Sequence, residues 1–253
     1  MPAGDKTARL AGWLYSAYAW SLVAVLLPLF GAVIIALRRP ALARPAARSG
    51  ARLLLRLAGM PATVRGLEHL PGVPHILLVN HTSFLDGIAL MALLPAHPGY
   101  AFVVRQQFRV QRLLCPLLKA LGTLVLMPAG AGSHAGNAVL MAQALRRRGS
   151  LVIFPEAGFV PQPGLRRFHS GAFVAAMRTG APLVPAGLRG ARLALQPLQW
   201  TMRRTALTLE IGAALATENQ DLAALMATAR AALLTLSGEP DAAGERQRAP
   251  DRG

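Results

Sequence analysis

The sequence predicts an α/β fold with a mostly parallel or mixed central sheet covered by helices, preceded by an N-terminal membrane helix or helical hairpin. Three observations lead to this expectation. Short apolar runs alternate with helical stretches beyond Gly59, a long uncharged segment lies near the N-terminus, and hydrophobic residues make up 53% of the 253 positions. A chain of this length suits one α/β domain with a large core, or at most two small domains.

The first element expected is a membrane helix, because no charged residue lies between Leu10 and Leu37. A straight helix over this segment would reach roughly 42 Å, enough to cross a bilayer with tilt. Pro28 should kink it, so the segment fits one tilted crossing or a bent pair of helices in one leaflet. A cleaved signal peptide is the alternative, but the apolar stretch is too long for one.

Arginines after this segment set the expected orientation. Only Lys6 and Arg9 precede the segment, whereas six arginines follow it, at positions 38, 39, 44, 48, 52 and 56. The positive-inside rule then places the bulk of the chain on the cytoplasmic face of the cell inner membrane. The last four arginines are spaced four apart, which indicates a basic amphipathic helix on an anionic membrane surface, or else the solvated face of an ordinary helix.

The charge balance narrows the classes of partner. A formal net charge of +16 points to an anionic partner: an acidic membrane surface, a phosphorylated or CoA-linked substrate, or nucleic acid. We expect no nucleic acid, because the chain has no lysine-rich tract, zinc-ligand spacing or aromatic RNA-binding motif. The histidines outside the first motif below show no metal-ligand pattern, so no metal site is expected either.

Three regions are expected along the chain: anchoring helices over 1–58, a catalytic α/β domain over 59–237, and a polar, disordered tail over 238–253. Apolar runs predict strands near 62–66, 75–79, 100–104, 123–127, 151–154, 182–188 and 205–211. Helical patterns fall near 83–94, 106–120, 134–148, 168–179 and 219–236.

The first chemistry-bearing motif runs from Asn80 to Asp86, directly after a strand-like run. His81 should then lie at the sheet edge where open α/β sheets bind ligands. Asp86, in the first turn of the next helix, can fold back and hold one ring nitrogen of His81, which raises the basicity of the other. Such a pair can take a proton from a substrate hydroxyl, although a capping arrangement with a surface histidine would show the same spacing.

The second motif, Phe154-Pro155-Glu156-Ala157-Gly158, also ends a strand-like run. Proline and glycine residues follow it and predict a rigid loop whose backbone N–H groups can approach a ligand. Arg166 and Arg167 in that loop offer guanidinium donors to a phosphate. The alternative is a plain strand–loop–helix connection with a solvated glutamate.

Together the motifs resemble those of the phospholipid acyltransferase family that includes the 1-acylglycerol-3-phosphate acyltransferases. Asn80, His81 and Asp86 fit its Asn-His-x4-Asp block, and the stretch from Phe154 to Glu156 matches the start of its Phe-Pro-Glu-Gly-Thr block. Residues 184–190 are similar to its later Val-Pro-Val block. Order and spacing agree from about 62 to 212, and an N-terminal membrane segment is common in that family.

The resemblance implies acyl transfer from acyl-CoA or acyl carrier protein to a lysolipid hydroxyl, with His81 as general base and Asp86 orienting it. It implies no covalent acyl-enzyme, no cofactor and no metal. Arg105 resembles the basic position after the family's second core strand. By the same resemblance, the substrate-binding residues expected are Asn80, Arg105, Glu156, Ala157, Gly158, Arg166, Arg167 and Arg189.

Two departures from the family pattern concern the acceptor. Phe159 stands where the family often has the arginine of Gly-Thr-Arg, and Pro128 stands where its Gly-x-x-Phe-x-x-Arg block would end. Both missing arginines are associated with the acceptor's phosphate. The acceptors expected are therefore lysophosphatidic acid, another lysophospholipid, or a hydroxylated amino-acid lipid such as lyso-ornithine lipid. A non-catalytic lipid-binding protein is the second hypothesis, and a hydrolase using Ser83 is weak because no Gly-x-Ser-x-Gly elbow is present.

Overall fold

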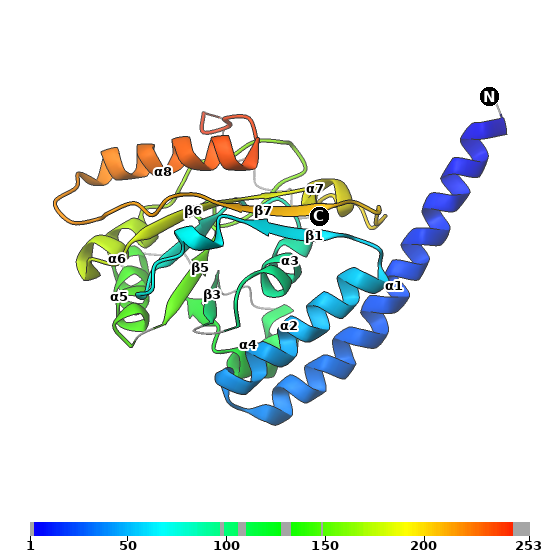
Figure 1. The fold of residues 1–253 in the computed structure, drawn as a ribbon, viewed down its shortest axis with the longest axis horizontal. Helices are drawn as coiled ribbons and strands as arrows, with labels where there is room; N and C mark the ends of the chain where they lie inside the picture. Colours follow the sequence, from blue (N-terminus) through cyan, green and yellow to red (C-terminus); the bar gives the residue numbers. More distant parts are fainter. Residues whose placement is uncertain (1–2, 97–98, 106–109, 128–132, 148, 245–253) are drawn as a thin grey trace.

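A mixed sheet of seven strands runs through the part of the chain that the computed structural model describes, residues 3–96, 99–105, 110–127, 133–147 and 149–244 (Figure 1). Its spatial order is β1-β7-β6-β2-β5-β3-β4. Neighbouring strands pair in parallel, except that β6 and β7 are antiparallel. The strands are β1 (Ala62–Arg65), β2 (Ile76–Val79), β3 (Tyr100–Arg105), β4 (Leu124–Leu126), β5 (Ser150–Ile153), β6 (Leu183–Arg189) and β7 (Leu207–Ile211). The expected mostly parallel, mixed sheet is confirmed.

Helices cover both faces of the sheet, as the unbroken apolar run of β2 requires. Ile76 and Leu78 pack into a core on one face, and Leu77 and Val79 pack into a core on the other. The first core is closed by α5 (Ser133–Arg146), α6 (Gly171–Thr179) and α8 (Leu222–Ser237). The second is closed by α2 (Pro40–Leu57), α3 (Leu85–Leu93) and α7 (Ala191–Ala194).

The sheet order brings the two motifs together. Strand β2 lies between β6 and β5 and is parallel to both. The carboxyl ends of parallel strands meet at one edge of a sheet, so the loops after β2 and β5 are neighbours although 75 residues separate His81 from Glu156.

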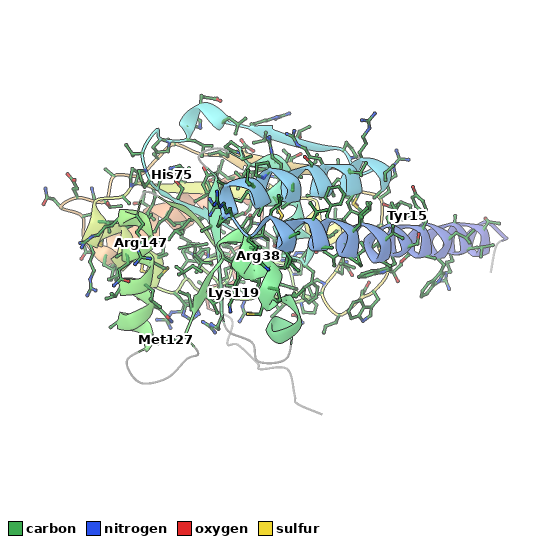
Figure 2. The ribbon with its side chains drawn as sticks, turned by 90° about the horizontal axis from the view of Figure 1, so that it is seen from below. Tyr15, Arg38, His75, Lys119, Met127 and Arg147 are labelled. Atoms are coloured by element: carbon green, nitrogen blue, oxygen red, sulfur yellow. The ribbon has the colours of Figure 1, made fainter. Side chains whose placement is uncertain are left out.

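The N-terminal region forms a helical hairpin. Helix α1 (Ala3–Leu37) and α2 lie side by side, joined at Arg38, which has a left-handed φ of 53° (Figures 1 and 2). The bent pair of helices expected within Leu10–Leu37 is wrong, because α1 continues through Pro28. A proline removes one N–H donor, and packing of α1 against α2 on both sides of Pro28 keeps the helix continuous.

The arginine row of α2 is turned partly inward. Arg44 Nε donates to the carbonyl of Leu121 at the end of α4 (Val110–Leu121), and Arg52 Nε donates to the carbonyl of Ala92 in α3. Neither a fully solvated face nor a face turned wholly to lipid fits these contacts. The i, i+4 spacing of charges cannot distinguish a helix face turned to lipid from one turned to the carbonyl ends of other helices.

The polar tail is ordered for longer than expected. Glu239 pairs with Arg192 of α7 and Asp241 pairs with Arg230 of α8, so residues 238–244 are tied to the domain. The tail acids neutralise arginines of the helices, which a composition-based expectation of disorder does not consider. Residues 245–253 lie outside the described part of the chain, and the division into three regions stays a prediction.

Candidate active site

A buried carboxylate orients the imidazole of His81. Asp86 Oδ2 lies 2.8 Å from His81 Nδ1, and the Asp86 side chain is fully buried, whereas that of His81 is 19% exposed. A carboxylate only accepts here, so Nδ1 carries the proton and donates it. This fixes the tautomer that leaves a lone pair on Nε2, the nitrogen on the other side of the ring.

Asp86 is itself held by the loop before it. Its Oδ2 accepts the backbone N–H groups of Thr82 at 2.6 Å and Ser83 at 2.9 Å. The chain from His81 to Ser83 thus wraps around one carboxylate oxygen, which explains why a five-residue spacing brings the imidazole and the carboxylate into contact. Ser83 Oγ donates to the carbonyl of Leu195 at 2.7 Å, so its hydroxyl proton is already used and the geometry does not favour it as a nucleophile.

Aromatic rings enclose the imidazole. Phe154 stacks on His81 with ring centroids 4.1 Å apart, and Phe159 meets the imidazole edge-on at 4.4 Å. Phe84, which is 65% exposed, meets Phe159 edge-on at 4.8 Å. The rings therefore fix the imidazole plane and make the immediate surroundings of the base apolar.

Glu156 joins the two motif loops. Its Oε1 accepts the backbone N–H of His81 and its Oε2 accepts the backbone N–H of Arg166, both at 2.8 Å. Burial of this side chain raises the pKa of Glu156 to about 7, against the lowering effect of the two hydrogen bonds. The carboxylate was expected to contact substrate, but both its oxygens are taken by backbone and only 2% of the residue is exposed. This favours a positioning role.

Asn80 also positions the His81 loop, because its side chain is bonded to the backbone of β6. Its Nδ2 donates to the carbonyl of Leu188 at 2.9 Å, and its Oδ1 accepts the N–H of Leu188 at 2.7 Å. The side chain thereby continues the pairing of β2 with β6 by one step after the strand has ended. Because Asn80 is 1% exposed, it fixes the start of the His81 loop and offers little surface to a substrate.

A family model described as Acyltransferase matches residues 61–189, about half of the chain, and both motifs lie inside the match. The chain belongs to the Acyltransferase family.

Known proteins support this assignment. The chain is 29% identical over 129 residues to a chloroplastic 1-acyl-sn-glycerol-3-phosphate acyltransferase of Brassica napus, covering 50% of this chain and 37% of that protein. It is 32% identical over 131 residues to a lyso-ornithine lipid O-acyltransferase of Pseudomonas aeruginosa, covering 52% and 49%. The match thus spans less than half the length of these curated relatives.

A solved structure shares the fold. The 1-acyl-sn-glycerophosphate acyltransferase PlsC of Thermotoga maritima superposes with a TM-score of 0.68, covering 90% of this chain and 94% of that one. The two sequences are only 17% identical, so this similarity shows that the two proteins share a fold and nothing more.

The four arginines expected to bind substrate differ in their surroundings. Arg105 is exposed at the carboxyl end of β3, the same sheet edge as His81, and Arg166 and Arg167 lie in the loop that Glu156 holds. Arg189 instead donates from Nε to the carbonyl of Leu236 at 2.7 Å, at the end of α8. The geometry therefore favours a helix-capping role for Arg189 and leaves Arg105, Arg166 and Arg167 as candidates for substrate contact.

Ala157 and Gly158 form the turn after Glu156. Ala157 has a left-handed φ of 56°, and its N–H donates to the carbonyl of Phe154 at 3.0 Å. A non-glycine residue in this conformation is strained by roughly 1 kcal/mol. Nothing lies within 4 Å of where a Gly158 side chain would begin, so the backbone there is open to a ligand.

Two residues near the site have structural roles that the sequence analysis did not predict. Phe159 was noted only as a departure from the family pattern, yet it touches the imidazole. Arg192 of α7 forms a two-bond ion pair with Glu239 and donates from Nη1 to the carbonyls of residues 160–162, at 3.0–3.2 Å. It holds the loop that carries Phe159, and no motif or spacing in the sequence signals that contact.

Proposed function

We propose that the protein transfers a fatty acyl group from an acyl thioester, acyl-CoA or acyl carrier protein, to the hydroxyl of a lysolipid. The observation that carries the proposal is the His81–Asp86 pair. Asp86 fixes the proton on Nδ1, and among the described residues His81 Nε2 has no hydrogen-bond partner, while the imidazole is partly exposed. A neutral imidazole with one oriented and one open nitrogen suits a general base.

In the proposed reaction, His81 alone performs both proton transfers. Nε2 takes the proton of the acceptor hydroxyl as its oxygen forms a bond to the thioester carbonyl carbon. Asp86 stabilises the imidazolium that results. When the tetrahedral intermediate collapses, the carbon–sulfur bond breaks and the thiolate leaves. The imidazolium returns its proton to the sulfur, which regenerates the base and gives the ester and a free thiol.

Phe159 favours an acceptor other than lysophosphatidic acid. In the family an arginine often follows the Phe-Pro-Glu block, and here a phenylalanine takes that position and lies 4.4 Å from the imidazole. An aromatic ring offers no charge-assisted hydrogen bond to a phosphate monoester. We therefore propose an acceptor with an uncharged or amino-acid headgroup region near the reacting hydroxyl, such as lyso-ornithine lipid, the acceptor class named for the relative in Pseudomonas aeruginosa.

The hairpin is proposed to rest in one leaflet of the membrane. Among the described helices one, spanning Arg9–Leu37, is long and apolar enough to cross a bilayer. However, Tyr15 donates to the carbonyl of Ala58 at the end of α2, and Trp20 donates to that of Trp200, so α1 is fastened both to α2 and to the catalytic domain. Moving α1 through the bilayer would take the arginines of α2 with it, at high cost. Insertion on the cytoplasmic side of the inner membrane agrees with those arginines.

A thiol-release assay on detergent-solubilised protein tests the proposal. Acyl-CoA and acyl carrier protein would each be offered with lysophosphatidic acid, other lysophospholipids and lyso-ornithine lipid. We expect thiol release that depends on both an acceptor and His81, and a higher kcat/KM with lyso-ornithine lipid than with lysophosphatidic acid. Lysolipid binding without thiol release for either donor would contradict the catalytic proposal and favour the lipid-binding alternative.

Side-specific labelling tests the one-leaflet geometry. Single cysteines at positions 7 and 65, in a Cys115→Ser background, would be exposed to a membrane-impermeant maleimide in sealed membrane vesicles. A hairpin in one leaflet places both positions on the same side, so both should label together. Labelling from opposite sides would show that α1 crosses the bilayer.

A further inference from the structure

A charged pocket lies at the end of α3 remote from His81. Helix α3 begins beside the His81 loop, and its other end, with Leu90 and Leu94, helps to line a small recess that is partly open to solvent. Arg44 and Arg48 of α2 and Phe102 of β3 complete this wall. We call this recess the Arg44–Arg48 pocket. Its position along α3 separates it from the catalytic site.

The pocket carries positive charge, and no acidic residue of the described chain lines it. Arg44 and Arg48 are half-buried, and none of the lining residues is acidic. The sequence has no Asp or Glu between Lys6 and Leu67, and Asp86 of α3 is committed to His81 at the other end of that helix. Burial lowers the pKa of both arginines, and for Arg48 the adjacent Arg52 lowers it further. An anion would relieve this imbalance.

One of the arginines that line the pocket has a hydrogen-bond donor without a partner among the described residues. Arg44 and Arg52 each place Nε on a helix carbonyl. Arg48, one turn from each of them, has a buried Nε with no hydrogen-bond partner among the described residues. Buried donors are nearly always paired, so this nitrogen indicates a missing acceptor.

Glycines in two turns, Gly99 and Gly122, leave room for the Arg44 guanidinium because they have no side chain. Gly99 and Gly122 both have left-handed φ angles, +77° and +69°. A side chain on Gly99 would begin 3.2 Å from Arg44 Nη1, and one on Gly122 would begin 3.2 Å from Arg44 Nη2. The guanidinium is therefore fixed between two backbone turns and does not move freely on the surface, which reduces the entropy that a ligand must overcome.

We propose that the Arg44–Arg48 pocket binds a phosphate group, with the two guanidinium groups as its ligands. Guanidinium forks match phosphate oxygens in geometry and charge, and Arg48, whose buried Nε has no hydrogen-bond partner among the described residues, keeps a donor that the fold does not use. The phosphate group that we propose is the headgroup of a membrane phospholipid. Helices α1 and α2 expose the apolar residues Leu29, Val33 and Leu42, which would contact the membrane beside the pocket. Bound there, the headgroup would hold the hairpin against α3 and α4 at a site separate from the acceptor's.

Equilibrium binding to detergent-solubilised full-length protein tests the proposal. Calorimetric titration would use two probes, inorganic phosphate and mixed micelles containing phosphatidylglycerol, with no acyl donor present. The test variant is Arg48→Gln, which removes the unpaired Nε and breaks no side-chain hydrogen bond between described residues. The matched control is Arg56→Gln, which makes the same charge change on the same helix but outside the pocket. Thermal unfolding would confirm that both variants fold.

We expect wild type and Arg56→Gln to bind with the same Kd and Arg48→Gln to bind about 10-fold more weakly. If inorganic phosphate shows this pattern, the phosphate group alone suffices. If only the phosphatidylglycerol micelles show it, the ligand is a lipid headgroup. Equal weakening in both variants would reduce the effect to general electrostatics and overturn the proposal, as would the absence of saturable binding to either probe. Because no turnover is measured, this result is independent of the proposed reaction.

Discussion

Glu156 accepts the backbone N–H of His81 at 2.8 Å, although 75 residues separate them. The second motif thus holds the first one in place, and the same carboxylate fixes the loop at Arg166. One buried side chain therefore sets the position of the proposed base relative to the loop that carries Arg166.

Replacing Asp86 with asparagine should lower kcat by at least about 100-fold, because the amide no longer secures the Nδ1–H tautomer or stabilises an imidazolium. The check is acceptor-dependent thiol release. Asp221→Asn is a suitable control, since Asp221 makes the same type of side-chain bond to a backbone N–H at the start of α8. Equal effects of the two changes would point to a general loss of folding instead.

Replacing Glu156 with glutamine should change the pH dependence of stability. The pKa of Glu156 is raised to about 7 in the folded protein. Between its ordinary value and 7, the folded state keeps a proton that the unfolded state has lost, so the free energy of unfolding falls as pH rises. Relative to Glu156→Gln, wild type should lose about 3 kcal/mol over this range and show no further change above it.

Urea unfolding of both proteins in detergent, from pH 4.5 to 8, measures that difference. The subtraction cancels titrations that the two proteins share. A difference that is flat over the range, or that grows in favour of wild type as pH rises, would contradict the assignment of a protonated, buried Glu156.

Introducing an arginine at Phe159 should move acceptor preference toward lysophosphatidic acid. A guanidinium beside the site can form a charge-assisted bond to a phosphate monoester, worth roughly a 10-fold gain in relative kcat/KM. The comparison is kcat/KM for lysophosphatidic acid over that for lyso-ornithine lipid. Leu198→Arg adds the same charge at a residue that is 83% exposed, and an equal shift there would mean that general charge attraction is responsible.

Replacing Ala157 with glycine should stabilise the protein by about 1 kcal/mol, because glycine adopts the left-handed φ of 56° without a Cβ clash. The measurement is the free energy of unfolding in urea. Ala191→Gly in α7 is the reference, since Ala191 has an ordinary helical backbone and should lose stability on the same change. A loss of stability at both positions would show that Ala157 is not strained.

Placing a charge on the outer side of α1 should weaken membrane binding. Leu29 is 57% exposed on α1 and Leu193 is 59% exposed on α7, so the two residues form a matched pair. Leu29→Asp should reduce partitioning onto phosphatidylglycerol vesicles by about 10-fold, because an apolar contact is lost and a charge must be buried. Leu193→Asp should bind as wild type does, and the same loss in both variants would place membrane contact elsewhere.

The sequence predicts those parts of the site that depend on local spacing or on strand ends. The His81–Asp86 contact follows from a short loop, and the alternating apolar runs predict the covered sheet. The Glu156–His81 bond depends on β2 and β5 being neighbours, which the strand order along the chain does not reveal. Arg189 caps the end of α8, and Arg192 of α7 holds the loop at residues 160–162. Both contacts depend on how the helices pack, so sequence motifs do not predict them.

The arginine row of α2 shows a second limit. Its spacing predicts one basic face, but lipid, solvent and the carbonyl ends of α3 and α4 all accept guanidinium groups. Only the packing of the hairpin decides among them. The structure places Arg44 and Arg52 on helix carbonyls and leaves Arg48 Nε without a partner among the described residues.

The central claim is that His81 Nε2 is the base for acyl transfer, and His81→Ala tests it most directly. Acylated lysolipid and released thiol would be measured together, beside His69→Ala, which removes an exposed histidine that follows the edge strand β1 and contacts the carbonyl of Ile211. We predict that His81→Ala loses transfer by at least about 100-fold while folding and vesicle binding stay intact, and that His69→Ala stays active. Turnover at the wild-type rate in folded His81→Ala protein would contradict the mechanism.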